Sequence, residues 1–265
     1  MKLRETYWQW GHPEGYSNNH FGNTRVARMT PMEGCLYLGI QKTFMVPDFW
    51  DIDAYKRRQY NMSFETLKEV AWQFKIDYEN GINPEQADPL IEEAKECKNI
   101  TAVVLDDFVK KGKYANISVE SLWALRDHLH ENGLQMWMVL YTEEFGFKKE
   151  EDEAFQKYIE PFDGIIMWNW RESEYLEIPE KFEIFKEMTR NKRRMVGCYL
   201  YNFGQGCPAT GSVVKWQLDL YRKWQFDGEI EGVVLHTNAL ADVGYEAYAA
   251  CREWMAEHGD DEIPE

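Results

Sequence analysis

From residue 99 onward, the sequence repeats a unit made of a short apolar run, a polar or aromatic loop and an amphipathic helix. Five such units follow one another at a spacing of roughly 30 residues, which is typical of βαβ units. The five predicted strands are residues 99–108, 134–141, 163–170, 194–204 and 231–238. Strands that alternate with helices need crossover connections, so the sequence predicts a parallel sheet covered by helices.

The first hundred residues are less regular. Residues 5–11 and 35–46 are predicted as two further strands, and residues 63–81 and 87–99 as helices. Seven strands are countable and an eighth is hidden, so we predict a (β/α)8 TIM barrel with an irregular N-terminal end, formed by residues 1–265 as a single domain. An open doubly wound sheet is the alternative, but the Gly-x-Gly-x-x-Gly turn usual in that fold does not occur.

Charge and cysteine content narrow the classes of function. A formal net charge of −16 argues against a nucleic-acid partner, which needs clustered Lys and Arg, and against an anionic membrane surface. The five cysteines are scattered and form no Cys-x-x-Cys pair, so neither a disulfide framework nor a zinc cluster is indicated. Without an apolar run that resembles a signal peptide or a membrane span, we expect a cytoplasmic protein. The oligomeric state stays open.

Large rings gather at the predicted strand ends, where the active site of a parallel barrel lies. Nearly every end joins a ring to a carboxylate, an amide or an imidazole, and such a surface suits the apolar and hydroxylated faces of a pyranose. We therefore predict a sugar or oligosaccharide ligand. The candidate substrate-binding residues are Trp8, Trp10, Tyr141, Trp168, Asn169, Trp170, Tyr199, Tyr201, Asn202, His236 and Asn238.

Acidic residues at the same ends are the catalytic candidates. Asp106 and Asp107 close an apolar strand, and adjacent carboxylates raise each other's pKa, which keeps a general acid protonated. Either Glu143 or Glu144 is the partner carboxylate from the next strand, and Glu172 is a further candidate. Hydrolysis of a glycosidic bond uses two carboxyl groups, so Asp106, Asp107, Glu144 and Glu172 are predicted as catalytic. Which residue of each adjacent pair faces the site stays open.

Histidine spacing gives no support for a dedicated metal site or a cofactor. His-Glu-x-x-His does not occur, and the His-x-His of His128 and His130 falls on a predicted helix, where both side chains are expected to be solvated. A looser set of Asp107, Glu144 and His236 would suit the first alternative function, a metal-dependent sugar isomerase, epimerase or lyase. His12 and His20 fall in a segment rich in Gly and Asn, which we expect at the entrance of the site.

The aromatic strand ends, with the segments "VVLDDF", "IMWNW" and "CYLYNFG", resemble those of the glycoside-hydrolase-type TIM barrels. Within that class, the resemblance is nearest to the chitinase-type barrels. The resemblance implies a TIM barrel and a glycoside hydrolase. The chitinase pattern Asp-x-x-Asp-x-Asp-x-Glu is incomplete here, because Phe108 and Val109 stand where its Glu is expected, and Asn202 replaces an expected Asp. This departure leaves a second alternative, a barrel that binds carbohydrate without turning it over.

Overall fold

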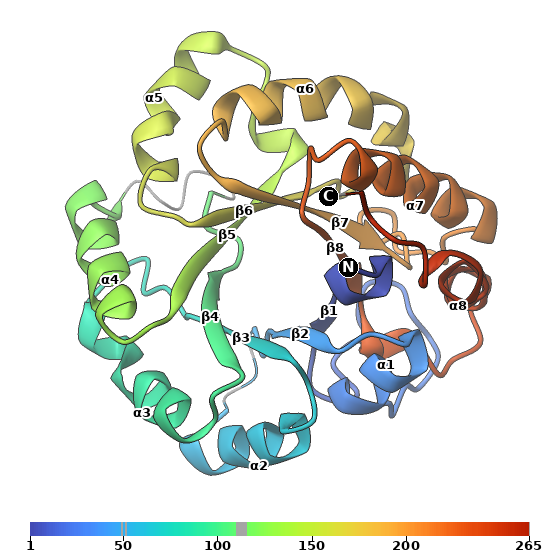
Figure 1. Ribbon diagram of the computed structural model, residues 1–265, viewed down its shortest axis with the longest axis horizontal. Helices are drawn as coiled ribbons and strands as arrows, with labels where there is room; N and C mark the ends of the chain where they lie inside the picture. The colour runs from blue at the N-terminus through green and yellow to red at the C-terminus, as the bar shows by residue number, and fades with distance from the viewer. Residues whose placement is uncertain (49, 51, 110–115, 265) are drawn as a thin grey trace.

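The computed structural model describes residues 1–48, 50, 52–109 and 116–264. Within these residues, eight parallel strands pair in chain order, and β1 pairs with β8 to close the sheet. Figure 1 looks into the closed sheet, with helices α1 to α8 arranged around the strands. The chain is a TIM barrel.

The strands are short and almost entirely buried, as expected for a parallel sheet that helices cover. They are β1 Tyr7–Gly11, β2 Lys42–Met45, β3 Glu69–Gln73, β4 Ile100–Leu105, β5 Gln135–Tyr141, β6 Gly164–Trp168, β7 Arg193–Tyr199 and β8 Gly232–His236. The helices are α1 Pro31–Leu38, α2 Ala54–Phe64, α3 Asp88–Glu96, α4 Val119–Glu131, α5 Lys149–Ile159, α6 Ile178–Met188, α7 Gly211–Phe226 and α8 Glu246–His258. The five predicted strand–helix units and the predicted barrel are therefore confirmed.

The irregular N-terminal end has two causes, of which helix α1 is the first. The prediction of a single strand over residues 35–46 is wrong, because α1 takes its first half and β2 only its second. The Thr30 side chain accepts the N–H of Glu33, and the Glu33 carboxylate accepts the N–H of Thr30, so the two form a capping box. Gly39, with φ +72°, ends the helix in the left-handed conformation. These caps fix a helix where the apolar run alone favoured a strand.

The second cause is the eighth strand, β3, which lies inside residues 63–81, a segment that we predicted as a helix. Helix α2 ends at Phe64, and β3 begins five residues later. Strand β3 pairs with β2 on one side and with β4 on the other, and its three central residues are buried. In so short an apolar run, the periodicity of the sequence does not distinguish a strand from a helix. Pairing with the two neighbouring strands makes this segment a strand.

Alternation along β1 fills the barrel with aromatic rings. Trp8 and Trp10 contact Phe44, with ring centroids 4.6 Å and 5.6 Å apart, whereas Tyr7, one residue before Trp8, packs against Trp254 of α8. Trp10 also meets Trp168 of β6 edge to face at 5.5 Å. The core below the carboxyl ends of the strands is therefore a stack of large rings.

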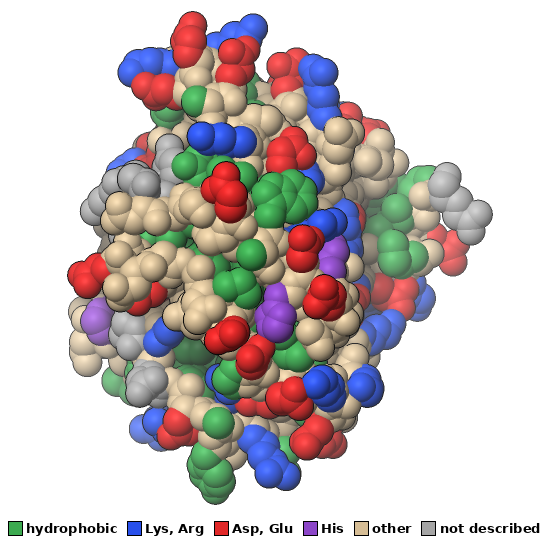
Figure 2. Space-filling model, turned by 90° about the vertical axis from the view of Figure 1, so that its left-hand side faces the viewer, with side chains coloured by type: hydrophobic (Ala, Val, Ile, Leu, Met, Phe, Trp, Pro, Cys, Tyr) green, Lys and Arg blue, Asp and Glu red, His purple; other side chains and the backbone are tan. Residues whose placement is uncertain are grey.

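The outer surface is polar. On the side of the molecule that Figure 2 shows, acidic and basic side chains are interspersed, and apolar side chains form small separate patches. None of the described helices is long and apolar enough to cross a membrane. The two termini lie side by side, since the Leu3 N–H donates to the Asp261 carbonyl at 2.9 Å.

Candidate functional site

A cavity of about 120 Å³ lies at the carboxyl ends of the barrel strands. Four of its wall residues, Tyr141, Trp168, Tyr199 and His236, are the last residues of β5, β6, β7 and β8. Its volume is close to the ~150 Å³ of an apolar cavity that holds one benzene molecule. The wall consists of Trp10, His12, Tyr16, Phe21, Asp48, Asp106, Asp107, Tyr141, Trp168, Trp170, Tyr199, Phe203 and His236.

Asp48 reaches the cavity from the segment that follows β2. Its backbone has φ +53°, a left-handed conformation that non-glycine residues seldom adopt. Two contacts hold it there: its N–H donates to the Gln73 side-chain oxygen at 2.7 Å, and its carboxylate accepts the Tyr16 hydroxyl at 2.7 Å. Such a conformation costs about 1–3 kcal/mol, and residues of this kind cluster at functional sites.

Asp106 and Asp107 reach the cavity from the end of β4. Asp107 also has a left-handed backbone, with φ +51°. Its N–H donates to the Asp106 carboxylate at 2.9 Å, and its carbonyl accepts the Tyr78 hydroxyl at 2.9 Å. Both aspartates line the cavity, so a single strand end supplies two carboxylates, one of them on a strained backbone.

The pKa values of four surrounding tyrosines indicate a negative electrostatic potential in the cavity. Burial is the main cause that raises the pKa of Tyr16, Tyr78, Tyr141 and Tyr199, and the charges of Asp106 and Asp107 raise each of these pKa values further. No Lys or Arg stands among the described residues of the cavity wall. The cavity therefore favours positive charge and disfavours a second negative charge.

Two buried histidines, His12 and His236, belong to the same wall, where His12 stacks on Tyr16 at 3.8 Å and His236 lies 4.9 Å from Tyr199, between ring centroids. His12 Nδ1 lies 2.6 Å from the Val46 carbonyl oxygen, so this nitrogen carries a proton and donates it. Burial lowers the pKa of His12 to about 4, and burial followed by the charge of His12 lowers the pKa of His236 well below its usual range. Both rings are therefore neutral near pH 7. His12 Nε2 must then accept the proton of His236 Nε2, which lies 3.2 Å away.

Neutral burial of these histidines predicts a loss of stability in mild acid. The unfolded chain takes up protons near pH 6.5, whereas His12 in the folded chain resists protonation down to a pH of about 4. The free energy of unfolding should therefore fall by about 2 kcal/mol between pH 7 and pH 5 through His12 alone, and His236 should add to this loss. Urea titration at both pH values should show a smaller loss in His12→Gln, with exposed His20→Gln as the control. Equal losses in all three proteins would contradict this account.

Eight of the predicted site residues line this cavity: Asp106, Asp107, Trp10, Tyr141, Trp168, Trp170, Tyr199 and His236. Trp168, the last residue of β6, and Trp170, two residues beyond the strand, both line the cavity, whereas Asn169 between them is not a wall residue. The Asn169 side-chain amide donates to the Thr142 hydroxyl at 3.0 Å. This amide is therefore a structural group outside the cavity wall.

The predicted partner carboxylates lie outside the wall. The Glu144 carboxylate accepts the N–H of Tyr141 at 2.9 Å, which folds it back onto its own turn. Glu143 forms an ion pair with Arg171 at 2.6 Å, and Glu172 accepts a hydrogen bond from the Asn202 side chain at 3.4 Å. Glu144 and Glu172 are therefore not among the residues of the cavity wall, whereas Asp106 and Asp107 are.

Four more predicted ligand residues have structural contacts. Trp8 lies below Trp10, and the Tyr201 hydroxyl donates to the Phe21 carbonyl at 3.0 Å. Asn202 and Gln205 bond to each other through their side chains. Asn238 brackets His12: its side chain accepts the His12 N–H at 2.8 Å and donates to the His12 carbonyl at 2.9 Å. Asn238 therefore positions a wall residue without reaching the cavity.

Asp48, Tyr16, Phe21 and Phe203 line the cavity and were missing from the sequence-based candidates. Asp48 had a usable signal, because it follows β2 closely, as Asp106 follows β4. The predicted strand over residues 35–46 ends within one residue of β2, so this signal was present in the sequence and was not used. His12, expected at the entrance, is 3 % exposed and belongs to the wall itself.

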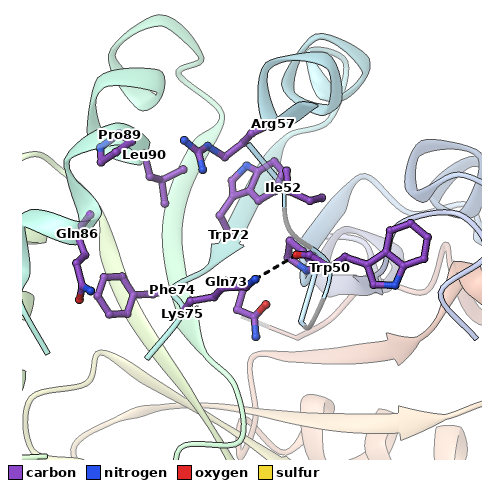
Figure 3. Close-up of a pocket in the computed structure, with 12 residues that line it drawn as sticks. Trp50, Ile52, Arg57, Trp72, Gln73, Phe74, Lys75, Gln86, Pro89 and Leu90 are labelled. Atoms are coloured by element: carbon purple, nitrogen blue, oxygen red, sulfur yellow. Dashed lines mark hydrogen bonds between the residues drawn. The ribbon is translucent and has the colours of Figure 1, made fainter. Parts of the chain in front are cut away.

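A larger cavity of about 250 Å³ lies between β3, α2 and α3 (Figure 3). Trp72, Phe74 and Leu90 point into it, and the dashed line marks the Lys75 ammonium donating to the Trp50 carbonyl at 3.1 Å. Its other cation, Arg57, donates to both carboxylate oxygens of Glu93 at 2.7 Å and 2.8 Å. Since its charged groups are engaged with protein partners, this cavity is a weaker candidate despite its size.

Within the described part of the chain, no group of three or more His, Cys, Asp and Glu side chains is placed to hold a metal ion. The looser set of Asp107, Glu144 and His236 is not brought together, because Glu144 is bound to the turn after β5.

Comparison with known proteins shows the fold. No protein-family model and no curated protein sequence matches the chain. Similar solved structures include tryptophan synthase from the α2β2 complex of Pyrococcus furiosus, 13% identical over 97% of this chain and 98% of that chain, with a TM-score of 0.52. A mutant α-subunit from the same organism has 13% identity, the same coverage and a TM-score of 0.53. Tryptophan synthase of M. tuberculosis is 11% identical over 98% of this chain and 94% of that chain, with a TM-score of 0.52.

These comparisons contradict the predicted function. The similar structures are tryptophan synthases and not glycoside hydrolases, so the predictions of a glycoside hydrolase and of a sugar or oligosaccharide ligand are wrong. The two alternatives, a metal-dependent sugar isomerase, epimerase or lyase and a carbohydrate-binding barrel, have no match either. At 11% to 13% identity, the structural similarity supports the TIM-barrel fold and says nothing about the substrate.

Proposed function

We propose that this chain is an enzyme whose substrate is a small organic cation, an amine or ammonium compound bound at the carboxyl ends of the barrel strands. One observation carries the proposal. The cavity wall combines eight Trp, Tyr and Phe rings with three aspartates, and no Lys or Arg stands among its described residues. The active sites of characterised TIM-barrel enzymes lie at this end of the barrel.

Rings and carboxylates together suit a cation better than other ligands. The faces of aromatic rings attract positive charge, by about 2 kcal/mol when the site is desolvated. The raised pKa values of Tyr16 and Tyr199 point the same way, because Asp106 and Asp107 make the surroundings negative. An anion would be repelled, and a neutral apolar ligand would gain nothing from the carboxylates. The volume of about 120 Å³ suits a trimethylammonium group.

In this proposal the carboxylates of Asp106 and Asp107 attract the charged nitrogen of the substrate. Where that nitrogen is a protonated amine, the nearer carboxylate is placed to accept its proton, which leaves a neutral amine and a neutral carboxyl group. The net charge of −16 increases the rate of encounter with a cation. We take residues 1–265 as one domain in a reducing compartment such as the cytoplasm, since all five cysteines are free.

Choline and its neutral isostere 3,3-dimethylbutan-1-ol test this proposal, because they differ in charge and scarcely in shape. Choline at about 100 times its dissociation constant should stabilise the fold by about 2.7 kcal/mol, which raises the melting temperature by a few degrees. At the same concentration, the neutral isostere should raise the melting temperature much less. Equal shifts from both compounds, or none from either, would defeat the proposal.

Two controls sharpen this experiment. Asp106→Asn should reduce the shift that choline causes, whereas Glu150→Gln, an equal change of charge at an exposed site on α5, should leave it unchanged. Proton NMR of choline incubated with the protein then separates turnover from binding alone.

A further inference from the structure

Two buried ring nitrogens on the cavity wall lack a hydrogen-bond partner within the described residues. They are Trp168 Nε1 and His236 Nδ1, in side chains that are 2 % and 7 % exposed. A buried polar atom left unsatisfied costs about 1–3 kcal/mol, so two on one wall require an explanation.

The two nitrogens have opposite hydrogen-bonding roles. An indole nitrogen is always a donor. His236 Nδ1 is an acceptor, because the proton of this ring lies on Nε2, where it bonds to His12. That assignment follows from the Val46 carbonyl, which requires the His12 proton on Nδ1 and leaves His12 Nε2 to accept. The wall therefore offers one donor and one acceptor.

The two rings are neighbours in the same cavity wall. Their centroids lie 5.8 Å apart, and their planes are nearly perpendicular at 86°. A single ligand group that serves both nitrogens has to accept one hydrogen bond and donate another. A hydroxyl both accepts and donates, whereas a carboxylate lacks the donor and an ammonium lacks the acceptor.

We infer that the substrate is an amino alcohol, whose hydroxyl oxygen accepts from Trp168 Nε1 while its proton is donated to His236 Nδ1. This inference rests on the proposed function, since Asp106 and Asp107 would hold the ammonium end of the same molecule. The cavity of about 120 Å³ limits that molecule to a short chain between the two polar ends.

Choline and propyltrimethylammonium test the inference, because a methyl group in the second replaces the hydroxyl of the first. Isothermal titration should show choline binding at least tenfold more tightly to the wild-type protein. In Trp168→Phe the ratio should fall towards one. Trp254→Phe removes another buried indole N–H, which donates to Asp219 on the outside of the barrel at 2.7 Å, and should keep the wild-type ratio.

Nitrogen NMR of the wild-type histidines needs no variant and guards against a Trp168→Phe protein that fails to fold. His236 should be protonated on Nε2 and not on Nδ1, and choline should shift its Nδ1 resonance. Protonation on Nδ1 would overturn the inference. Equal affinity for the two cations, both above the neutral isostere, would overturn the hydroxyl site and leave the proposed function intact. Failure of both cations to bind would overturn the two together.

Discussion

Gly197→Ala should lower the free energy of unfolding by about 3 kcal/mol and abolish ligand binding at the barrel mouth. A Cβ at this position of β7 would lie 2.1 Å from Cδ2 and Cε3 of Trp168. The indole has little room to retreat, because Tyr199 lies 4.6 Å from it and Trp10 5.5 Å, between ring centroids. The ring would have to move into the cavity or deform the sheet. Urea unfolding measures the first effect, and titration with choline measures the second.

Gly228→Ala is the matched control for this substitution. Gly228 follows α7 with φ +72°, and no atom lies within 4 Å of the Cβ position. Alanine there should cost only the left-handed backbone, about 1 kcal/mol. If Gly197→Ala were no more costly than Gly228→Ala, the packing of Trp168 against β7 would be refuted.

Asp107→Asn should weaken the binding of choline by about 10- to 100-fold with little change in stability. The quaternary nitrogen of choline has no N–H to donate, so Asp107 attracts it by charge alone, by about 3 kcal/mol at roughly 5 Å and an effective dielectric constant of about 20. Asparagine keeps the shape of the side chain without its charge. Asparagine also tolerates the left-handed backbone at φ +51°, so the strand end should keep its conformation. Titration calorimetry gives the affinity, and urea unfolding gives the stability.

Two further variants separate charge from backbone at this position. Asp107→Gly removes the charge and also the strain of the left-handed backbone. It should therefore bind choline as weakly as Asp107→Asn does, and it should unfold at a higher urea concentration than Asp107→Asn. Asp127→Asn, at an exposed site on α4 beside Arg126, removes the same charge far from the cavity and should bind normally. Wild-type affinity in Asp107→Asn would remove Asp107 from the proposed site.

The sequence predicted the barrel from its periodic part. Near-continuous apolar runs such as residues 99–108 have to be buried on both faces, and the helices between them dictate parallel strands. The ends of these apolar runs also mark the ends of the strands. Asp106, Asp107, Trp168 and Tyr199 could therefore be predicted to lie near one another at the carboxyl ends of the strands. The prediction failed where caps and pairing override periodicity, at α1 and at β3. Asp48 was also missed, although the predicted strand over residues 35–46 ends within one residue of β2.

Which side chains face the cavity was decided only by the tertiary structure. Glu144 and Asp106 look equivalent in the sequence, yet one binds the N–H of Tyr141 and the other lines the wall. The protonation of His236 depends on a carbonyl at Val46, nearly two hundred residues away in the chain. Periodicity reflects burial, which is a property of each segment alone, whereas the direction of a hydrogen bond depends on partners that only the closed barrel brings together.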